Sequence, residues 1–215
     1  MDPLSDVLAL LKPHSHRSGG YEVPSSFSLR YPKYEGIKCY AIVSGQAWLS
    51  VDGVPDAVLL TAGDCFLLAS GRSFCLATDL SVAPVDFWTF LAELRNGRTF
   101  ASNDSGGCYL VGGHFVLGGS HADILLGSLP PIVHVRNESD KAAMRWSIER
   151  MKEELRDPRP GGSLVAQELA YMMLVQALRL HLADVARGDV GWLFALADKQ
   201  MSAAITCMHD DPAHR

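Results

Sequence analysis

The fold is decided by one stretch of strand-forming side chains, Ile37-Lys38-Cys39-Tyr40-Ala41-Ile42-Val43-Ser44-Gly45-Gln46-Ala47-Trp48-Leu49-Ser50-Val51. Two β-rich runs, 37–43 and 46–51, flank Ser44-Gly45, a two-residue connection of hairpin type. In the second run, apolar and more polar positions alternate with the period of two that a strand requires. The apolar face carries Ala47, Leu49 and Val51. The stretch therefore predicts two consecutive strands.

The same rhythm extends over the first two-thirds of the chain. Further strands are expected over 27–31, 57–60, 64–69, 73–77 and 108–117, because glycine, proline, aspartate and serine separate these runs. Residues 84–98 break the rhythm, since their apolar side chains recur at spacings of three and four and predict a short helical insertion. Closely spaced strands with this much turn chemistry favour a small barrel or a sandwich.

From residue 140 onward the apolar side chains follow a helical period. One helix is expected there, with an N-cap at Ser139 or Asp140 and proline and glycine terminators over 158–162. A second helix is expected from Ser163 to about Arg187, and the two form an antiparallel hairpin. A third helix is expected to begin at Trp192 and to run toward His209.

The second helix carries an apolar set wide enough to face two partners. This set is Val165, Leu169, Met172, Met173, Ala177 and Leu180. One interpretation is that the hairpin packs only on the barrel. The interpretation we favour is that it also self-associates, because the apolar surface exceeds what one barrel face would cover. The expected contacts of this homodimer are Leu169, Met172, Met173 and Leu180.

Composition and charge restrict the class of protein. Hydrophobic residues make up 48% of the 215 residues, which predicts a real core. The formal net charge of -5 argues against nucleic acid lying along this segment, because neutralising phosphates needs a concentrated basic surface. No window approaches the roughly 20 apolar residues of a membrane span. The N-terminus carries acidic residues where a secretory signal carries basic ones.

The cysteines are odd in number and scattered without a CxxC pair, so neither a disulfide framework nor a zinc knuckle is expected. They are Cys39, Cys65, Cys75, Cys108 and Cys207. We interpret them as reduced thiols of a cytoplasmic protein. A thiol sensor made of Cys39, Cys65 and Cys75 is an alternative, although buried, inert cysteine is commoner.

Several segments, in their order and spacing, resemble the AraC/XylS regulators that have a cupin-type N-terminal half. They are Asp2-Pro3-Leu4-Ser5-Asp6-Val7-Leu8, the strand-turn-strand from Tyr40 to Leu49, the turn from Leu60 to Leu68, the junction from Leu129 to Val135, and the stretch from Gly191 to Asp198 that continues to Pro212. The resemblance covers essentially the whole chain.

The resemblance implies a mainly β fold with added helices, a cupin-like (double-stranded β-helix) barrel followed by the helical hairpin. It implies an effector-binding barrel with an N-terminal arm over 1–135, a dimerising hairpin over 136–188, and a linker helix over 189–215. In such regulators the N-terminal half senses a small molecule and forms a homodimer. DNA contact would come only through a C-terminal domain that is absent from this chain.

Enzymatic cupins, which this barrel also resembles, hold a metal on two closely spaced histidines, a carboxylate and a later histidine. At the first of these motifs this chain offers Lys38, Cys39 and Tyr40, and the later ligand position falls on Phe74. Aromatic rings cannot replace imidazole as metal ligands. We therefore expect no catalytic metal and no other cofactor.

Small-molecule sites are concave and mostly apolar, with a few polar anchors. Candidate walls of such a site are Tyr40, Trp48 and Phe74, with Arg30 as the anchor. Arg30 lies six residues before Gly36, a spacing similar to that of a sugar-contacting arginine in the arabinose-sensing member of the family. The alternatives are core packing for the three aromatic residues and a surface ion pair for Arg30.

The histidines give no site of their own. His14 and His16 could bind a metal, but their Pro/Ser/Gly-rich surroundings favour a mobile surface pair. His114 and His121 are isolated, and each is expected to be a structural histidine.

Three functions remain open from the sequence. The leading hypothesis is a sensing and dimerisation module of a regulator, in which a ligand in the barrel rearranges the arm and the hairpin. The first alternative is a cupin-fold enzyme acting on a small metabolite, which metal analysis and turnover assays would reveal. The second is a dimerisation module with a filled barrel, whose melting temperature no metabolite would raise.

Overall fold

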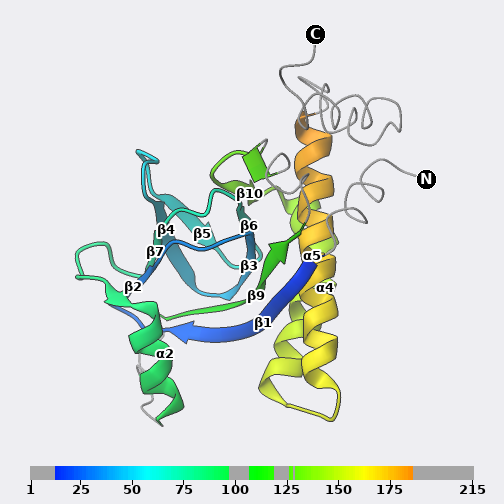
Figure 1. Ribbon diagram of the computed structural model, residues 1–215, viewed down its shortest axis with the longest axis horizontal. Coiled ribbons are helices and arrows are strands. Elements are labelled where there is room, and N and C mark those ends of the chain that lie inside the picture. Colours follow the sequence, from blue (N-terminus) through cyan, green and yellow to red (C-terminus); the bar gives the residue numbers. More distant parts are fainter. Residues whose placement is uncertain (1–12, 97–106, 119–125, 128, 186–215) are drawn as a thin grey trace, which may run out of the picture.

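A computed structural model of the protein describes residues 13–96, 107–118, 126–127 and 129–185. Its strands form two five-stranded sheets (Figure 1). The first sheet has the order β1 (Pro13–Val23), β9 (Cys108–Leu117), β3 (Ile37–Ser44), β6 (Cys65–Leu68) and β10 (Val133–Val135). The second has the order β5 (Val58–Thr61), β4 (Gln46–Val51), β7 (Phe74–Ala77), β2 (Ser28–Tyr31) and β8 (Val85–Asp86).

The chain passes from one sheet to the other at its turns, which closes the two sheets into a barrel. Gly45 joins β3 to β4 with a φ of 77°, and a Cβ there would lie 2.1 Å from the Gly107 carbonyl oxygen. Only glycine tolerates both conditions. The hairpin expected at Ser44-Gly45 is therefore wrong, because β3 pairs with β6 and β9 while β4 pairs with β5 and β7.

Strand β1 occupies a segment in which no strand was predicted. It pairs antiparallel with β9 from Pro13↔Leu117 to Val23↔Cys108. His14 and His16, which were expected to form a mobile surface pair, both belong to β1. Hydrogen bonding to β9, which lies some 90 residues away in the sequence, stabilises the extended conformation of β1, and the local composition gave no sign of this.

Three helices complete the described part of the chain. Helix α2 (Phe87–Arg95) confirms the predicted insertion, and its N-cap Asp86 accepts hydrogen bonds from the Trp88 and Thr89 amides. Helices α4 (Glu138–Arg156) and α5 (Gly162–Val185) form the predicted antiparallel hairpin. Helix α4 begins earlier than expected, with Asn137 at the N-cap position in place of Ser139 or Asp140. The expected third helix lies outside the described residues.

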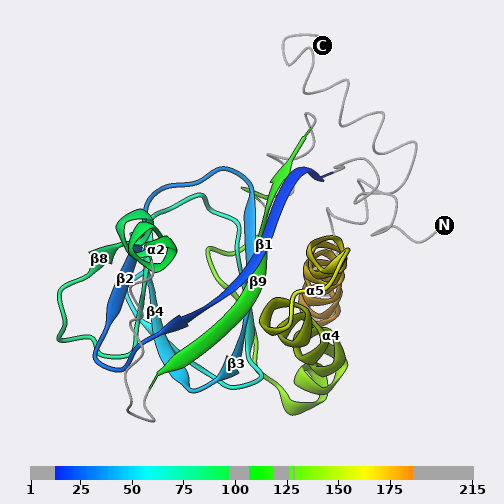
Figure 2. The same ribbon diagram turned by 90° about the horizontal axis from the view of Figure 1, so that it is seen from below.

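The hairpin packs on the outer face of the first sheet, and the second sheet lies on the far side of the barrel (Figure 2). Two buried clusters result. The barrel core lies between the sheets and includes Leu29, Tyr31, Tyr40, Ile42, Leu49, Phe66, Phe74 and Leu110. The hairpin core lies between the first sheet and the helices and includes Ile37, Cys39, Ala41, Leu67, Val111, Met144, Ile148, Leu169, Met173 and Leu174.

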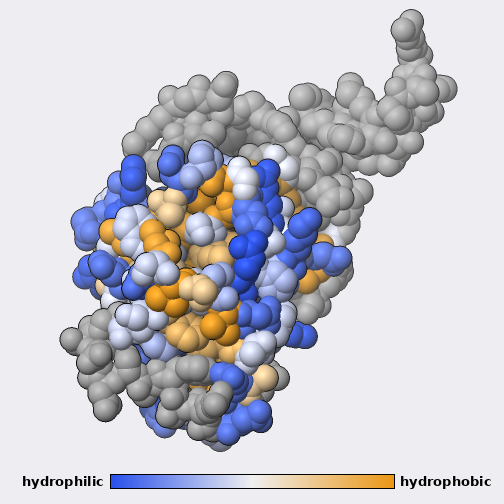
Figure 3. All heavy atoms as spheres, turned by 90° about the vertical axis from the view of Figure 1, so that its left-hand side faces the viewer, coloured by the Kyte–Doolittle hydropathy of each residue, from blue (hydrophilic) through white to orange (hydrophobic). Residues whose placement is uncertain are grey.

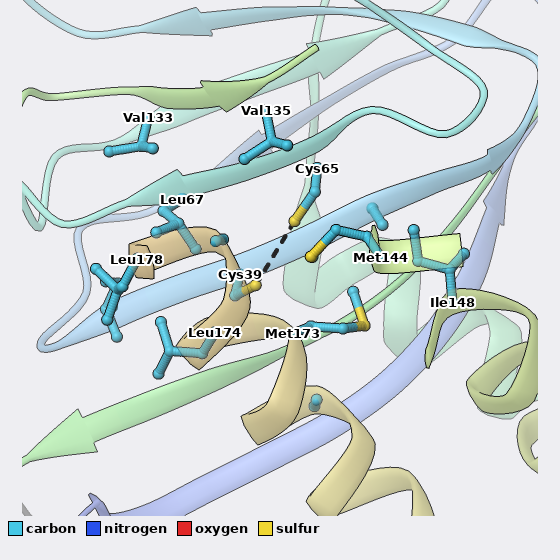
Figure 4. Close-up of a cluster of buried hydrophobic side chains, with 14 of the residues drawn as sticks. Cys39, Cys65, Leu67, Val133, Val135, Met144, Ile148, Met173, Leu174 and Leu178 are labelled. Atoms are coloured by element: carbon cyan, nitrogen blue, oxygen red, sulfur yellow. Dashed lines mark hydrogen bonds between the residues drawn. The ribbon is translucent and has the colours of Figure 1, made fainter. Parts of the chain in front are cut away.

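Strand β3 contributes to both cores because successive side chains point to opposite faces. Cys39 and Ala41 belong to the hairpin core, whereas Tyr40 and Ile42 belong to the barrel core. Figure 4 shows Cys39, with Cys65 and Leu67 from the neighbouring strand, facing Met144 of α4 and Met173 of α5. The mainly β fold with a helical hairpin is thus confirmed.

None of the helices described here combines the length and the apolar composition that crossing a lipid bilayer would demand.

Candidate functional site

The structure brings two of the four predicted ligand contacts together inside the barrel. Tyr40 and Phe74 are buried in the barrel core, at 8% and 0% exposure. Trp48 lies on the outer face of β4, directly opposite Leu59 of β5 and on the other face from Ala47 and Leu49. Trp48 therefore does not line the interior, which corrects its prediction as a wall.

Arg30 also lies outside the barrel. Its guanidinium forms an ion pair with Asp52, at 2.8 Å between Nη2 and Oδ2, and both side chains are about half exposed. The prediction of Arg30 as the ligand anchor is corrected, and the surface ion pair is what the structure shows. Figure 3 views this side of the molecule, where apolar side chains gather in the middle and hydrophilic ones surround them.

We expect the Arg30→Ala variant to lose no more than about 1 kcal/mol of folding free energy, because exposed ion pairs contribute little. Urea unfolding of the variant beside the wild-type chain measures this. A loss of several kcal/mol would show that Arg30 supports the structure in a way that the Asp52 ion pair does not explain.

Aromatic rings fill much of the barrel interior. The ring of Tyr31 stacks between those of Phe74 and Phe87, with 4.2 Å between centroids in each pair. The hydroxyls of Tyr21 and Tyr31 are hydrogen-bonded to each other, and burial raises the pKa of both. The ring centroids of Tyr40 and Phe66 lie 5.9 Å apart. The interior is thus apolar with hydroxyl groups at a few points.

Lys38 is the charged residue of this interior. The residue is 8% exposed, and it alternates along β3 with the residues of the hairpin core, so its side chain points into the barrel. Its Nζ lies 4.9 Å from the ring centroid of Tyr34, 5.9 Å from that of Tyr31 and 6.0 Å from that of Tyr40. Burial lowers the pKa of Lys38 to about 8.

No carboxylate of the described residues forms an ion pair with Lys38. Close by, the buried hydroxyl of Tyr34 has no hydrogen-bond acceptor for its proton. Burial raises the pKa of Tyr34, and only the Gly71 amide, a donor, opposes this rise appreciably. The Lys38 ammonium thus lies over the face of the Tyr34 ring, and the buried hydroxyl of that ring has no acceptor in the described residues.

His114 faces the same region but is satisfied within the chain. Its Nε2 lies 2.5 Å from the Glu35 carbonyl oxygen, and its ring packs edge-on against Tyr34. Burial lowers the pKa of His114, and the nearby Lys38 and Arg17 add to this effect. The expectation of a structural histidine holds for His114, whereas His121 lies outside the described residues.

A hollow of about 300 Å³ opens at this end of the barrel, lined by Gly36, Ala69, Ser70, Gly71, Leu126 and Gly127. Ala69 belongs to the hairpin core and Leu126 packs against that core, so the hollow lies at the edge of the first sheet on its hairpin side. Neither Lys38 nor Tyr34 lines it.

A second polar group joins the barrel to the hairpin. Asp64, whose side chain is 4% exposed, lies 2.8 Å from the Lys141 ammonium at the start of α4. Its other oxygen accepts hydrogen bonds from the Thr61 amide at 2.8 Å and from His134 Nε2 of β10 at 3.1 Å. Burial raises the pKa of Asp64, but the contacts with Lys141, Thr61 and His134 outweigh it and hold that pKa below its usual value.

Three of the four described cysteines, Cys39, Cys65 and Cys108, are buried. Cys75 is partly exposed, and its sulfur accepts a hydrogen bond from Arg30 Nη1 at 3.6 Å. The Cys39 and Cys65 sulfur atoms lie 3.9 Å apart in the hairpin core (Figure 4). Burial raises the pKa of Cys39, and it raises that of Cys108 to about 12. Thiols with raised pKa values are poor nucleophiles at neutral pH. The described residues also contain no group of three or more side chains that could hold a metal ion.

The predicted dimer contacts divide between two faces of α5. Leu169 and Met173 are 4% and 0% exposed and belong to the hairpin core, so they cannot form the surface expected of them. Leu180 is partly buried against the same core. Met172 is 49% exposed, and Leu164 and Val165, eight and seven residues earlier, are exposed with it.

The sequence model of the cupin family matches residues 2–183. An AraC-like transcription regulator from Streptomyces lividans is 38% identical over 214 residues, which cover 99% of this chain and 70% of that protein. A second one, from Streptomyces antibioticus, is 37% identical and covers 100% of this chain and 71% of its own length. The chain belongs to the AraC-like transcription regulators.

Among solved structures, that of ToxT from Vibrio cholerae covers 94% of this chain, and this chain covers 67% of it, with 11% identity and a TM-score of 0.43. The cupin match on this AraC-like chain runs through the barrel and both hairpin helices.

Sequence reasoning missed the polar residues that matter most in this AraC-like barrel. Lys38 stands inside a run of apolar side chains in the 37–43 strand, and the period of two places it on one face with Tyr40. A charge at such a position was the available signal. The pairing of Lys38 with Tyr34, and of Asp64 with Lys141, depends on tertiary contacts that no local pattern shows.

Proposed function

We propose that this chain senses a small-molecule effector in its barrel and dimerises through its hairpin. In this proposal residues 1–135 form the sensing unit, 136–188 the dimerising unit, and 189–215 the link to a DNA-binding domain outside the chain. The protein acts in the cytoplasm, where a transcription regulator meets its DNA, and it is not an enzyme. The membership in the AraC-like regulators supports this proposal.

The observation that carries the proposal is the wall shared by the two cores. The first sheet has the barrel core on its inner face and the hairpin core on its outer face. A ligand that shifts β3 or β6 from inside therefore also shifts the surface on which the helices pack. Asp64 strengthens this link, because it ties the β5–β6 turn to the first turn of α4. Such a link lets ligand affinity bias the arrangement of the hairpin.

One observation favours the second candidate function, a dimerisation module without a ligand. The Tyr31, Phe74 and Phe87 stack already fills part of the interior. A screen of metabolites by melting temperature separates the two, because a ligand that binds only the folded chain at 100 times its Kd stabilises it by about 2.7 kcal/mol. The sensing function is lost if no metabolite raises the melting temperature.

For the dimer, we expect the Met172→Glu variant to associate at least tenfold more weakly than the wild-type chain. Met172, Leu164 and Val165 are exposed apolar residues of α5, and a charge buried among them in an interface would be desolvated without a partner. Sedimentation equilibrium of the 215-residue chain measures the dissociation constant.

The matched control is Leu59→Glu, which places the same charge at a similarly exposed position on the second sheet, away from the hairpin. It should leave the dimer unchanged. A wild-type chain that stays monomeric, or a dimer that both variants weaken equally, would contradict the assignment of the α5 surface.

A further inference from the structure

The barrel interior carries a cation that nothing in the described chain neutralises. Burying an ammonium is costly unless a charge or hydrogen-bond acceptor compensates it. Lys38 is 8% exposed, and its contacts in the described residues are the faces of three tyrosine rings. Cation–π contacts at 5 to 6 Å compensate only part of the lost hydration. A residue held at this cost has a structural or functional reason to be charged.

The surroundings of Lys38 indicate the partner it is built for. The Tyr34 hydroxyl, close by, also donates to nothing within the described residues. An ammonium over a tyrosine ring whose own hydroxyl lacks an acceptor fits a group with two acceptor oxygens and one negative charge. A doubly charged phosphate would keep an excess negative charge, since the single lysine would face it in aromatic surroundings.

We infer that the effector of this chain is a small organic carboxylate, whose two oxygens accept from Lys38 Nζ and from the Tyr34 hydroxyl while its apolar body packs on the tyrosine rings. This inference rests on the proposed sensing function and adds the chemical class of the effector.

The other basic side chains near Lys38 do not offer a competing site for the carboxylate. His114 donates to the Glu35 carbonyl, so it does not compete for the ligand. Arg30 lies on the outer surface in its ion pair with Asp52 and offers no second cation inside. Selectivity for an anion thus depends on Lys38, and a neutral molecule of the same shape would leave this cation without a counter-charge.

The experiment compares carboxylates with amides of the same shape. Acetate, benzoate and hexanoate, beside acetamide, benzamide and hexanamide, are titrated into the 215-residue chain while the melting temperature and the heat of binding are recorded. We expect at least one carboxylate to raise the melting temperature and its amide to have no effect. We expect Lys38→Met to weaken that binding at least tenfold and Tyr34→Phe to weaken it severalfold.

Two controls keep the result specific. Lys33→Met removes an exposed lysine five residues earlier and should leave the affinity unchanged. Lys38→Met replaces a desolvated cation by an apolar chain of similar length, so the variant should melt at or above the wild-type temperature. If Lys38→Met fails to fold, the affinity of Tyr34→Phe for the carboxylate tests the inference instead, because this variant keeps the aromatic ring.

The outcomes separate this inference from the proposed function. If a carboxylate and its amide bind equally, and the Lys38→Met variant binds both with unchanged affinity, the barrel senses a ligand but the carboxylate assignment is overturned. If a carboxylate binds and Lys38→Met does not weaken it, the site lies elsewhere and the inference is again overturned. If no carboxylate protects the wild-type chain better than its amide, the inference fails, while the metabolite screen and the dimer measurement still judge the proposed function.

Discussion

The Asp64→Ala variant should lose about 3–5 kcal/mol of folding free energy, the cost of removing one partner of a buried ion pair. Asp64 is almost fully buried and holds Lys141, Thr61 and His134, which belong to different elements. Its removal leaves the Lys141 ammonium, 13% exposed, beside Glu138 alone among the carboxylates of the described residues. Urea unfolding at pH 7 and one fixed protein concentration measures the loss.

The pH dependence gives this prediction an internal control. The pKa of Asp64 lies below its usual value in the folded chain, so its contribution is complete above the unfolded pKa of about 4. The contribution disappears as the pH falls through the folded pKa. The difference in stability between the wild-type chain and Asp64→Asn should therefore shrink between pH 6 and pH 3. A difference that stays constant over this range would mean that the charge of Asp64 is not what stabilises the joint.

Met173→Ala should cost about 2–5 kcal/mol, the range for truncating a buried methionine or leucine. Met173 is 0% exposed and faces Cys39 and Met144 in the hairpin core (Figure 4). The adjacent Met172→Ala is the matched control at a protein concentration at which the wild-type chain is monomeric. That side chain is half exposed, and its truncation in the monomer should change stability by less than about 0.5 kcal/mol. Urea unfolding of both variants at equal concentration measures the contrast.

The contrast between the two methionines tests the rotation of α5. If both variants lose the same free energy, or if Met172→Ala loses more, α5 does not present the face to the first sheet that the structure shows.

Much of the fold could be predicted from local patterns. The strands at 46–51 and 108–117 were predicted to the residue, because alternation and flanking glycines mark their ends. The strand at 13–23 was missed, since serine and glycine dominate it and its order comes from pairing with β9. The turn at Gly45 was predicted, but sequence alone could not tell a hairpin from a passage to the other sheet.

The site was predicted less well, for a related reason. Tyr40 and Phe74 were placed in the interior by residue type, and burial agrees. The prediction that Trp48 lines the interior was wrong because aromatic character was weighed above the strand period. That period already placed Trp48 on the other face of the strand from Ala47. Leu169 and Met173 failed because the width of an apolar helix surface does not say which part the same chain covers. The expected helix from Trp192 and the link over 189–215 lie outside the described residues.

The alternation along β3 has an evolutionary consequence. Residues 38, 40 and 42 face the barrel, and residues 37, 39 and 41 face the helices. Substitutions at the even positions can therefore retune which molecule is recognised, while the odd positions preserve the assembly. Related proteins that respond to different compounds should differ mainly at the even positions of this strand. A single inserted residue would exchange the two sets, so changes in length here should be rare among descendants that still fold.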